Sequence, residues 1–231
     1  MRPVFAAWAV HLYTALGAVV GFFALDATAH GDYGLAFVWM AVAIVIDATD
    51  GTLARRARVK EVLPQFDGAK LDDIVDYLNY VVVPIGLAYH AGLIPHGPGG
   101  LALAALPLLA SGYGFCQTQA KTADHFFTGF PSYWNIVVFY FFALATPVWF
   151  NTTLLLLFVV MVFVPIRYLY PSRNPVAQRT THVLGVVWAL AVVVLLAQFP
   201  TPSRTLAWLS LYFPVYYFAV SFHAHFRHRA A

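Results

Sequence analysis

Long apolar stretches separated by short polar connections run along almost the whole chain. Eight of them can be read from the sequence, at roughly residues 5–25, 34–52, 71–93, 99–119, 132–150, 152–169, 181–199 and 205–224. A helix rises 1.5 Å per residue, so segments of this length can cross most of a bilayer core of roughly 30 Å. The pattern predicts an all-α fold: a polytopic integral membrane bundle of about eight transmembrane helices, forming a single domain over residues 1–231.

Composition supports the same class. The chain is 61% hydrophobic and only 10% charged, with a mean hydropathy of +0.73, whereas soluble domains average about 25% charged residues. The formal net charge of +3 is too small to indicate a nucleic-acid partner. The single cysteine, Cys116, excludes an internal disulfide.

The basic residues set the expected orientation. If the eight segments alternate across the membrane, 12 of the 13 lysine and arginine residues fall on one side, and only Arg204 falls on the other. Cytoplasmic loops of membrane proteins are enriched in these residues. The sequence therefore predicts that both termini lie in the cytoplasm.

The first segment has an alternative interpretation as a signal peptide, because Ala27-Thr28-Ala29 is similar to a cleavage site. Polar His11, Tyr13 and Thr14 interrupt its apolar run at helical spacing. This spacing favours a retained helix with an inward face in a bundle.

The acidic residues are concentrated in one stretch. Seven of the ten lie between Asp47 and Asp76, namely Asp47, Asp50, Glu61, Asp67, Asp72, Asp73 and Asp76. Carboxylates beside hydrocarbon are costly, so they are seldom retained there without a function. Spacings of three and four residues place Asp47 with Asp50, and Asp72 with Asp76, each pair on one helix face. We expect the two faces to oppose each other and form a cluster of four carboxylates.

Four carboxylates this close repel one another unless a cation lies between them. Ligand sets made only of oxygen favour Mg²⁺ or Mn²⁺, and a pair of such ions suits chemistry at phosphorus. Gly51 and Ala54 leave room for a ligand against the backbone, and Arg55 offers a fork for a phosphate. Two alternatives are a solvated helix end with surface ion pairs and a cation or proton transporter. A transporter predicts carboxylates near the middle of the membrane.

The stretch resembles the signature of the CDP-alcohol phosphotransferase family, D-x-x-D-G-x-x-A-R, a spacer, then G-x-x-x-D-x-x-x-D. The matching positions are Asp47, Asp50, Gly51, Ala54, Arg55, Gly68, Asp72 and Asp76. The spacer departs from the pattern, because the 12 residues from Arg56 to Asp67 exceed the length in most members. This longer spacer, the chain length and the H-L-Y-T-A-L-G motif from His11 are similar to the bacterial branch that makes phosphatidylcholine.

This resemblance implies transfer of the phosphatidyl group from CDP-diacylglycerol to an alcohol, with release of CMP. It also implies that the reaction requires two divalent metal ions, Mn²⁺ or Mg²⁺. It implies metal ligands at Asp47, Asp50, Asp72 and Asp76, with Asp76 also the general base. It implies nucleotide contacts at Asp50, Gly51, Ala54, Arg55 and Gly68. The implied setting is the bacterial inner (cytoplasmic) membrane, and the bias of the basic residues predicts that the active site faces the cytoplasm. The implied partners are CDP-diacylglycerol, choline and membrane lipids, and a homodimer is the candidate assembly.

Choline is the alcohol we expect, because a polar and aromatic connection, residues 117–135, follows the fourth segment on the cytoplasmic side. A trimethylammonium group is held by aromatic faces through cation–π attraction. The candidates for choline are Tyr77, Tyr113, Tyr133, Trp134 and Tyr170, and those for the lipid phosphate are Arg167 and Arg173. The alternative for the aromatics is a belt that anchors helix ends, and for the arginines a general cytoplasmic bias. Serine is the alternative acceptor, as in a phosphatidylserine synthase.

Overall fold

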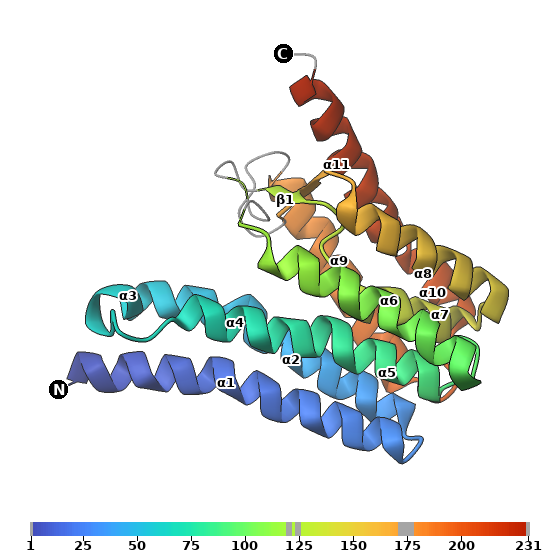
Figure 1. The fold of residues 1–231 in the computed structure, drawn as a ribbon, viewed down its shortest axis with the longest axis horizontal. Helices are drawn as coiled ribbons and strands as arrows, with labels where there is room; N and C mark the ends of the chain where they lie inside the picture. Colours follow the sequence, from blue (N-terminus) through green and yellow to red (C-terminus); the bar gives the residue numbers. More distant parts are fainter. Residues whose placement is uncertain (1, 119–121, 123–125, 171–177, 230–231) are drawn as a thin grey trace.

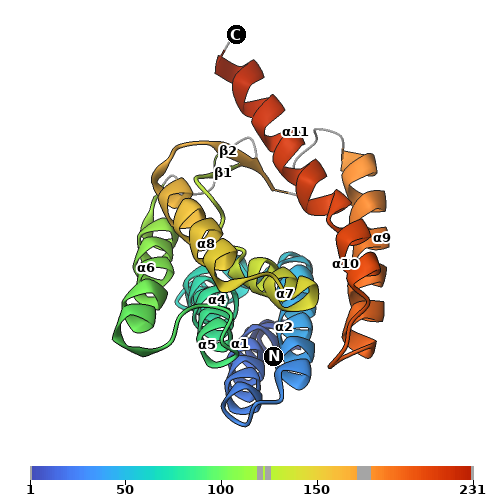
Figure 2. The same cartoon turned by 90° about the vertical axis from the view of Figure 1, so that its right-hand side faces the viewer.

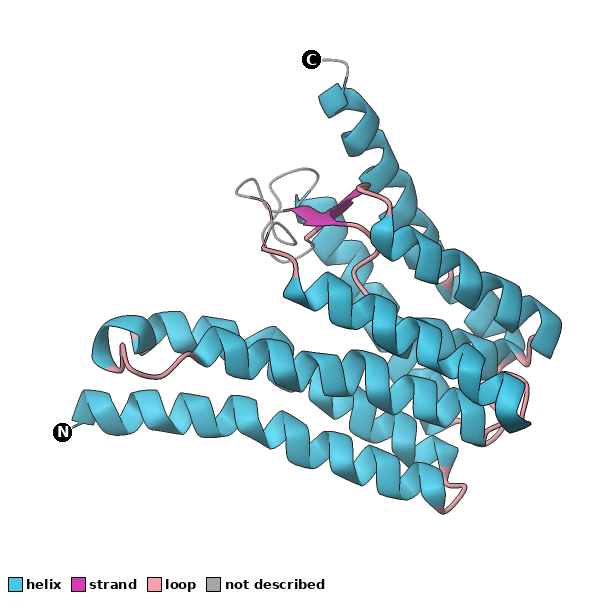
Figure 3. Ribbon diagram, in the orientation of Figure 1, coloured by secondary structure: helices cyan, strands magenta, loops and turns pink. Residues whose placement is uncertain are grey.

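A computed structural model describes residues 2–118, 122, 126–170 and 178–229 of the chain. Helices dominate the described part, and two short strands form one small sheet (Figures 1 and 3). The N-terminal elements are α1 (Arg2–Ala29), α2 (Tyr33–Arg56), α3 (Val59–Val62), α4 (Gly68–Tyr77), the π-helix η1 (Leu78–Val82), α5 (Val83–His90) and α6 (Gly97–Cys116). The C-terminal elements are β1 (Phe126–Thr128), α7 (Trp134–Leu144), α8 (Val148–Phe163), β2 (Arg167–Leu169), α9 (Gln178–Ala197), α10 (Arg204–Ser210) and α11 (Tyr212–Arg229).

The chain is an α-helical membrane protein. Within the described ranges, five helical stretches are long and apolar enough to cross a membrane: Pro3–Ala29, Tyr33–Arg56, Gly97–Cys116, Gln178–Ala197 and Arg204–Arg227. The third predicted segment is a continuous run of α4, η1 and α5. The number of about eight spans and the orientation of the termini stay predictions.

The fifth predicted segment, 132–150, is wrong in extent. The helix there, α7, has 11 residues and ends at Leu144, which makes it about 16 Å long, or half of a bilayer core. Ala145 adopts a left-handed conformation with φ +48°, and Pro147 precedes the next helix. Both features end α7, because neither the left-handed backbone nor proline continues a helix.

Helix α1, helix α2 and the continuous run of α4, η1 and α5 pack side by side in the N-terminal half (Figures 1 and 2). Glycines on α1 permit the close approach. A Cβ atom built on Gly17 would lie 2.6 Å from Val75 Cγ1, and one on Gly21 would lie 2.7 Å from Asn79 Oδ1. Small residues at helix interfaces let membrane helices approach closely. The stretch that carries the second pair of aspartates is thereby held tightly against α1.

A larger side chain at Gly21 is expected to destabilise the protein. In Gly21→Val, the new atoms meet buried Asn79, whose amide donates to the Gly17 carbonyl at 3.0 Å and is not free to move. Overpacking of this kind costs about 1–3 kcal/mol, so the melting temperature in detergent should fall. Gly112→Ala is the matched control, because nothing lies within 4 Å of its added Cβ. Equal melting temperatures for the two variants would refute tight packing at Gly21.

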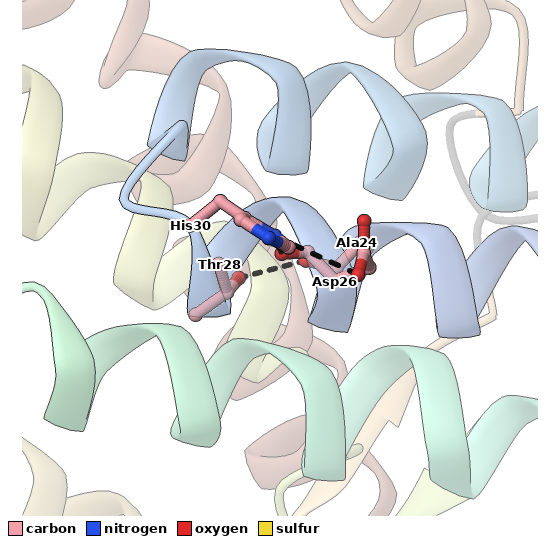
Figure 4. A network of polar contacts seen from close by, with 4 residues as sticks. All are labelled: Ala24, Asp26, Thr28 and His30. Atoms are coloured by element: carbon pink, nitrogen blue, oxygen red, sulfur yellow. Dashed lines mark hydrogen bonds and ion pairs between the residues drawn. The ribbon is translucent and has the colours of Figure 1, made fainter.

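A short turn connects the C-terminal end of α1 to the N-terminal end of α2 (Figure 4). The Thr28 hydroxyl donates to the Ala24 carbonyl at 2.8 Å, and His30 Nδ1 donates to the Asp26 carbonyl at 2.8 Å. The Asp32 side chain then accepts a backbone amide in the first turn of α2. These caps satisfy helix-end groups and let α2 return antiparallel to α1.

The two-stranded sheet was not predicted from the sequence. Strands β1 and β2 pair antiparallel, with Phe126 opposite Leu169. Helix α11 fastens β2, because the Ser221 hydroxyl accepts from the Leu169 amide at 3.0 Å and the Tyr217 hydroxyl donates to the Leu169 carbonyl at 3.0 Å. The connection after α6 and the chain after α8 are therefore held together at one end of the bundle.

Candidate metal and substrate site

Three of the four predicted carboxylates come together. Asp47 and Asp50 lie on α2 and Asp72 lies on α4, and each offers an oxygen within 4.8 Å of the others. Asp50 is buried, with 6% of its surface exposed, and the other two are half-buried. We call these three residues the carboxylate group. A set of oxygen ligands this close suits a hard divalent cation.

Two hydroxyls from other elements contact the carboxylate group. The Thr14 hydroxyl on α1 donates to Asp50 Oδ2 at 2.8 Å, and both side chains are buried. The Tyr80 hydroxyl on η1 donates to Asp47 Oδ2 at 2.6 Å. The group is thus fixed by α1, α2, α4 and η1 together.

Asp76 lies one helical turn after Asp72 and is half-buried. It is not part of the carboxylate group, and Tyr80 lies about one turn further along the same helical run. Its assignment as a metal ligand and general base stays a prediction. The neighbouring Asp73 lines a different, smaller cavity of about 180 Å³ between α4, α6 and the connection after β1.

A cavity of about 670 Å³ opens beside the carboxylate group. Asp47, Asp50 and Asp72 line one part of it. Apolar side chains from α7 to α11 line most of the rest, among them Leu154 and Trp208. Figure 2 shows α7 beside α2, with α8 to its left and α9, α10 and α11 to its right. A cavity with carboxylates in one part and hydrocarbon over the rest suits an amphiphilic ligand with a charged head.

Part of the predicted nucleotide-binding set lines this cavity. Asp50, Gly51 and Arg55 all contribute to its wall. The Arg55 guanidinium donates to the Thr52 hydroxyl at 2.8 Å, and it lines the same cavity as the carboxylate group. A phosphate bound there would find a fork of donors beside the acidic residues.

Ala54 and Gly68 do not line the cavity. Ala54 packs against the small cluster that α3 forms on α1. At Gly68, an added Cβ would lie 2.5 Å from the His11 ring, which is buried beneath Phe66 and Trp8. The close approach of His11 gives a packing reason for glycine at this position.

Four tyrosines form a tyrosine cluster in the cavity wall: Tyr80, Tyr133, Tyr170 and Tyr217. The ring of Tyr133 is central, with centroids 6.1 Å from both Tyr80 and Tyr217. Of these four, sequence reasoning proposed Tyr133 and Tyr170 for choline, but neither Tyr80 nor Tyr217. Tyr80 follows Asp76 by four residues, a spacing that could have indicated it, whereas Tyr217 comes from a distant helix and has no local signal.

The other three aromatic candidates lie elsewhere. The Tyr77 hydroxyl donates to the Leu108 carbonyl on α6 at 2.9 Å. Trp134 is completely buried, and its indole donates to the Ser111 hydroxyl at 2.8 Å. Tyr113 is half exposed and packs against Phe163. None of the three lines the large cavity, so their positions do not fit a direct contact with a ligand there.

The two arginines proposed for the lipid phosphate have different outcomes. The Arg167 guanidinium lies over the Phe126 ring, 4.4 Å from its centroid, and it does not line the large cavity. Arg173 lies outside the described residues. A phosphate contact of either one stays a prediction.

Comparison with known proteins decides the family. The chain is 42% identical to a phosphatidylcholine synthase of Legionella pneumophila, covering 96% of this chain and 90% of the relative. It is 38% identical to that of Legionella bozemanae, over 89% and 98%. The corresponding enzyme of Pseudomonas aeruginosa is 34% identical, over 84% and 81%. The chain belongs to the phosphatidylcholine synthase family.

A scan against protein-family models found no match. The relatives nevertheless confirm the resemblance drawn from the signature and the long spacer. The chain is accordingly an enzyme of the phosphatidyltransferase class, in a bacterial membrane.

Proposed function

We propose that the chain transfers the phosphatidyl group of CDP-diacylglycerol to choline, producing phosphatidylcholine and CMP. One observation carries this proposal: the carboxylate group, the tyrosine cluster and a long apolar wall share a single cavity. Headgroup chemistry, acceptor recognition and acyl-chain binding can therefore take place together. The relatives that carry the name phosphatidylcholine synthase support the same substrates.

The carboxylate group fits a divalent cation, because its three oxygens converge within 4.8 Å and belong to hard ligands. We propose that two divalent ions, Mn²⁺ or Mg²⁺, bind there and that Asp76 is a further ligand. The bound cations would supply positive charge that neutralises the pyrophosphate and stabilises CMP as it leaves. Arg55, at the same wall of the cavity, would bind a phosphate oxygen.

Asp76 is the proposed general base. The hydroxyl oxygen of choline forms a bond to the phosphorus of the phosphatidyl group, and the bond from that phosphorus to the CMP oxygen breaks. The hydroxyl proton passes to the Asp76 carboxylate, and the electron pair leaves with CMP. Asp76 lies about one turn before Tyr80 on the same helical run, and the Tyr80 ring centroid lies 6.1 Å from that of Tyr133, so the base would be close to an acceptor held by the tyrosine cluster.

We further propose that this site faces the cytoplasm in the bacterial inner membrane, within a topology of eight spans. Arg55, Arg56, Arg58 and Lys60 lie between Asp50 and Asp72 along the chain. Such a basic segment is typical of the cytoplasmic side and suits contact with anionic headgroups.

Removing the central ring of the tyrosine cluster should weaken choline binding. Tyr133→Ala is expected to raise the KM for choline about 5- to 30-fold, equivalent to about 1–2 kcal/mol of cation–π attraction. The KM for CDP-diacylglycerol should change little. Tyr113→Ala is the matched control, because Tyr113 lies on the exposed side of α6. If both variants had the same choline KM as the unsubstituted enzyme, the tyrosine cluster would not be the acceptor site.

The proposed function is tested by offering the purified protein CDP-diacylglycerol and Mn²⁺ with labelled choline, serine, glycerol or inositol in separate reactions. We expect labelled lipid and stoichiometric CMP with choline. Preferred labelling of serine would instead show a phosphatidylserine synthase. Serine recognition needs groups for both a carboxylate and an ammonium, whereas the cluster presents aromatic faces.

A further inference from the structure

Two of the three members of the carboxylate group receive a hydrogen bond from a hydroxyl on another element. Thr14 on α1 donates to Asp50 Oδ2 at 2.8 Å, and Tyr80 on η1 donates to Asp47 Oδ2 at 2.6 Å. Hydrogen bonds to an ionised acceptor are shorter and stronger than neutral ones. A donor on one oxygen fixes the rotation of the carboxylate, and so determines where its other oxygen points.

Thr14 is in place because α1 packs closely on its neighbours. Its side chain is 7% exposed and Asp50 is 6% exposed, so water competes little for this contact. Gly17, one turn further along α1, lies against Val75 on α4. The same helix therefore contacts both α2 and the helix that carries Asp72, which sets the distance between the two acidic faces.

Tyr80 is in place because the helix changes to a π-turn just after Asp76. The side-chain amide of Asn79 donates to the Val75 carbonyl at 3.0 Å and to the Gly17 carbonyl at 3.0 Å, which fastens the turn to α1. π-turns inside α-helices occur frequently at functional sites. Here the turn presents the Tyr80 hydroxyl to Asp47 while the Tyr80 ring packs beside Tyr133.

We propose that Thr14 and Tyr80 are positioning residues that orient Asp50 and Asp47 for the divalent cation, and that Tyr80 also connects the cation site to the acceptor site. This inference rests on the proposed function. Its physical basis is general, since the outer partners of metal ligands fix ligand orientation and their removal typically weakens metal binding 10- to 100-fold. Tyr80 has one further role, because its ring is part of the tyrosine cluster.

The direct test is titration of the purified protein with Mn²⁺ alone, followed by electron paramagnetic resonance of the free ion. Tyr80→Phe and Thr14→Val should each weaken Mn²⁺ binding about 10- to 100-fold. Tyr13→Phe and Thr28→Val are matched controls, because they remove hydroxyls from α1 that bond to Thr49 and to Ala24 rather than to a carboxylate. Both controls should bind Mn²⁺ as the unsubstituted protein does.

Kinetics separate positioning from a loss of structure. Raising the Mn²⁺ concentration should restore kcat in Tyr80→Phe, because the substitution removes only the hydroxyl that orients Asp47. Thr14→Ser keeps a hydroxyl and should retain Mn²⁺ affinity. A loss in Thr14→Ser equal to that in Thr14→Val would overturn the inference, as would unaltered Mn²⁺ affinity in both Tyr80→Phe and Thr14→Val.

The failure of this inference can be distinguished from failure of the proposed function. If Asp50→Asn loses Mn²⁺ while Tyr80→Phe and Thr14→Val keep it, the cation site stands and only the positioning role is wrong. If Asp50→Asn itself binds Mn²⁺ normally, the proposed cation site is wrong, and the positioning role fails with it.

Discussion

Asp76→Asn is expected to lower kcat about 10²- to 10⁴-fold, the range that a general base contributes, while CDP-diacylglycerol still binds. The amide is close in size to the carboxylate but cannot accept the choline proton at neutral pH. The carboxylate group and Arg55 are left intact, and the asparagine keeps one oxygen that can bind the cation, so the nucleotide end of the lipid keeps most of its contacts. Release of labelled CMP gives the rate, and equilibrium binding of labelled CDP-diacylglycerol gives the affinity.

Asp73→Asn is the matched control for that experiment. Asp73 is the adjacent residue on α4, but it lines the smaller cavity and is not part of the carboxylate group. We expect its rate to remain near that of the unsubstituted enzyme. Full turnover by Asp76→Asn would show that another group accepts the proton, and an equal loss in both variants would indicate a general effect of charge on α4.

Asp50→Asn is expected to abolish turnover by removing the cation. Asp50 is the most buried member of the carboxylate group, and replacing one oxygen by an amide removes both charge and a strong ligand. The Mn²⁺ affinity of this variant should fall by more than the 10- to 100-fold that is typical when a residue hydrogen-bonded to a metal ligand is removed. Mn²⁺ titration measures the affinity, and chelation followed by readdition of Mn²⁺ should suppress and restore activity in the unsubstituted enzyme.

Asp26→Asn is the control for Asp50→Asn. Asp26 lies near the end of α1, is exposed, and pairs with His30 at 3.6 Å. Exposed pairs of this kind contribute little to stability, so the variant should keep both Mn²⁺ affinity and turnover. Normal Mn²⁺ binding by Asp50→Asn would contradict the assignment of the carboxylate group as the cation site.

Local periodicity is the reason that part of the site could be predicted. Asp47 and Asp50 share a helix face whatever the rest of the fold does, and a charged face in an apolar chain must find a partner. Asp72 follows from the same reasoning on α4. The structure brings these three together, while the fourth carboxylate, Asp76, lies one turn further along.

Contacts between distant segments could not be predicted in this way. Tyr217 joins the tyrosine cluster from α11 through packing that no spacing along the chain reveals. Trp134 looked equally suitable for choline, but it is completely buried and bonded to Ser111. Aromatic composition indicates that a binding surface is available, but only the tertiary structure determines which rings face the cavity.

Short elements were also beyond prediction. Strands of three residues, such as β1 and β2, show too little alternation to be recognised. The end of α7 at Leu144 depends on the backbone of Ala145, a non-glycine residue that rarely adopts this conformation. The eight apolar segments therefore gave the class of the fold more securely than the length of each helix.

Anomalous X-ray diffraction from crystals grown with Mn²⁺, recorded at the manganese absorption edge, tests most directly that the carboxylate group holds a divalent cation. We predict an anomalous difference peak for a manganese ion that lies about 2 Å from oxygens of Asp47, Asp50 and Asp72. An active, Mn²⁺-saturated preparation with no anomalous peak among these three aspartates would contradict the account.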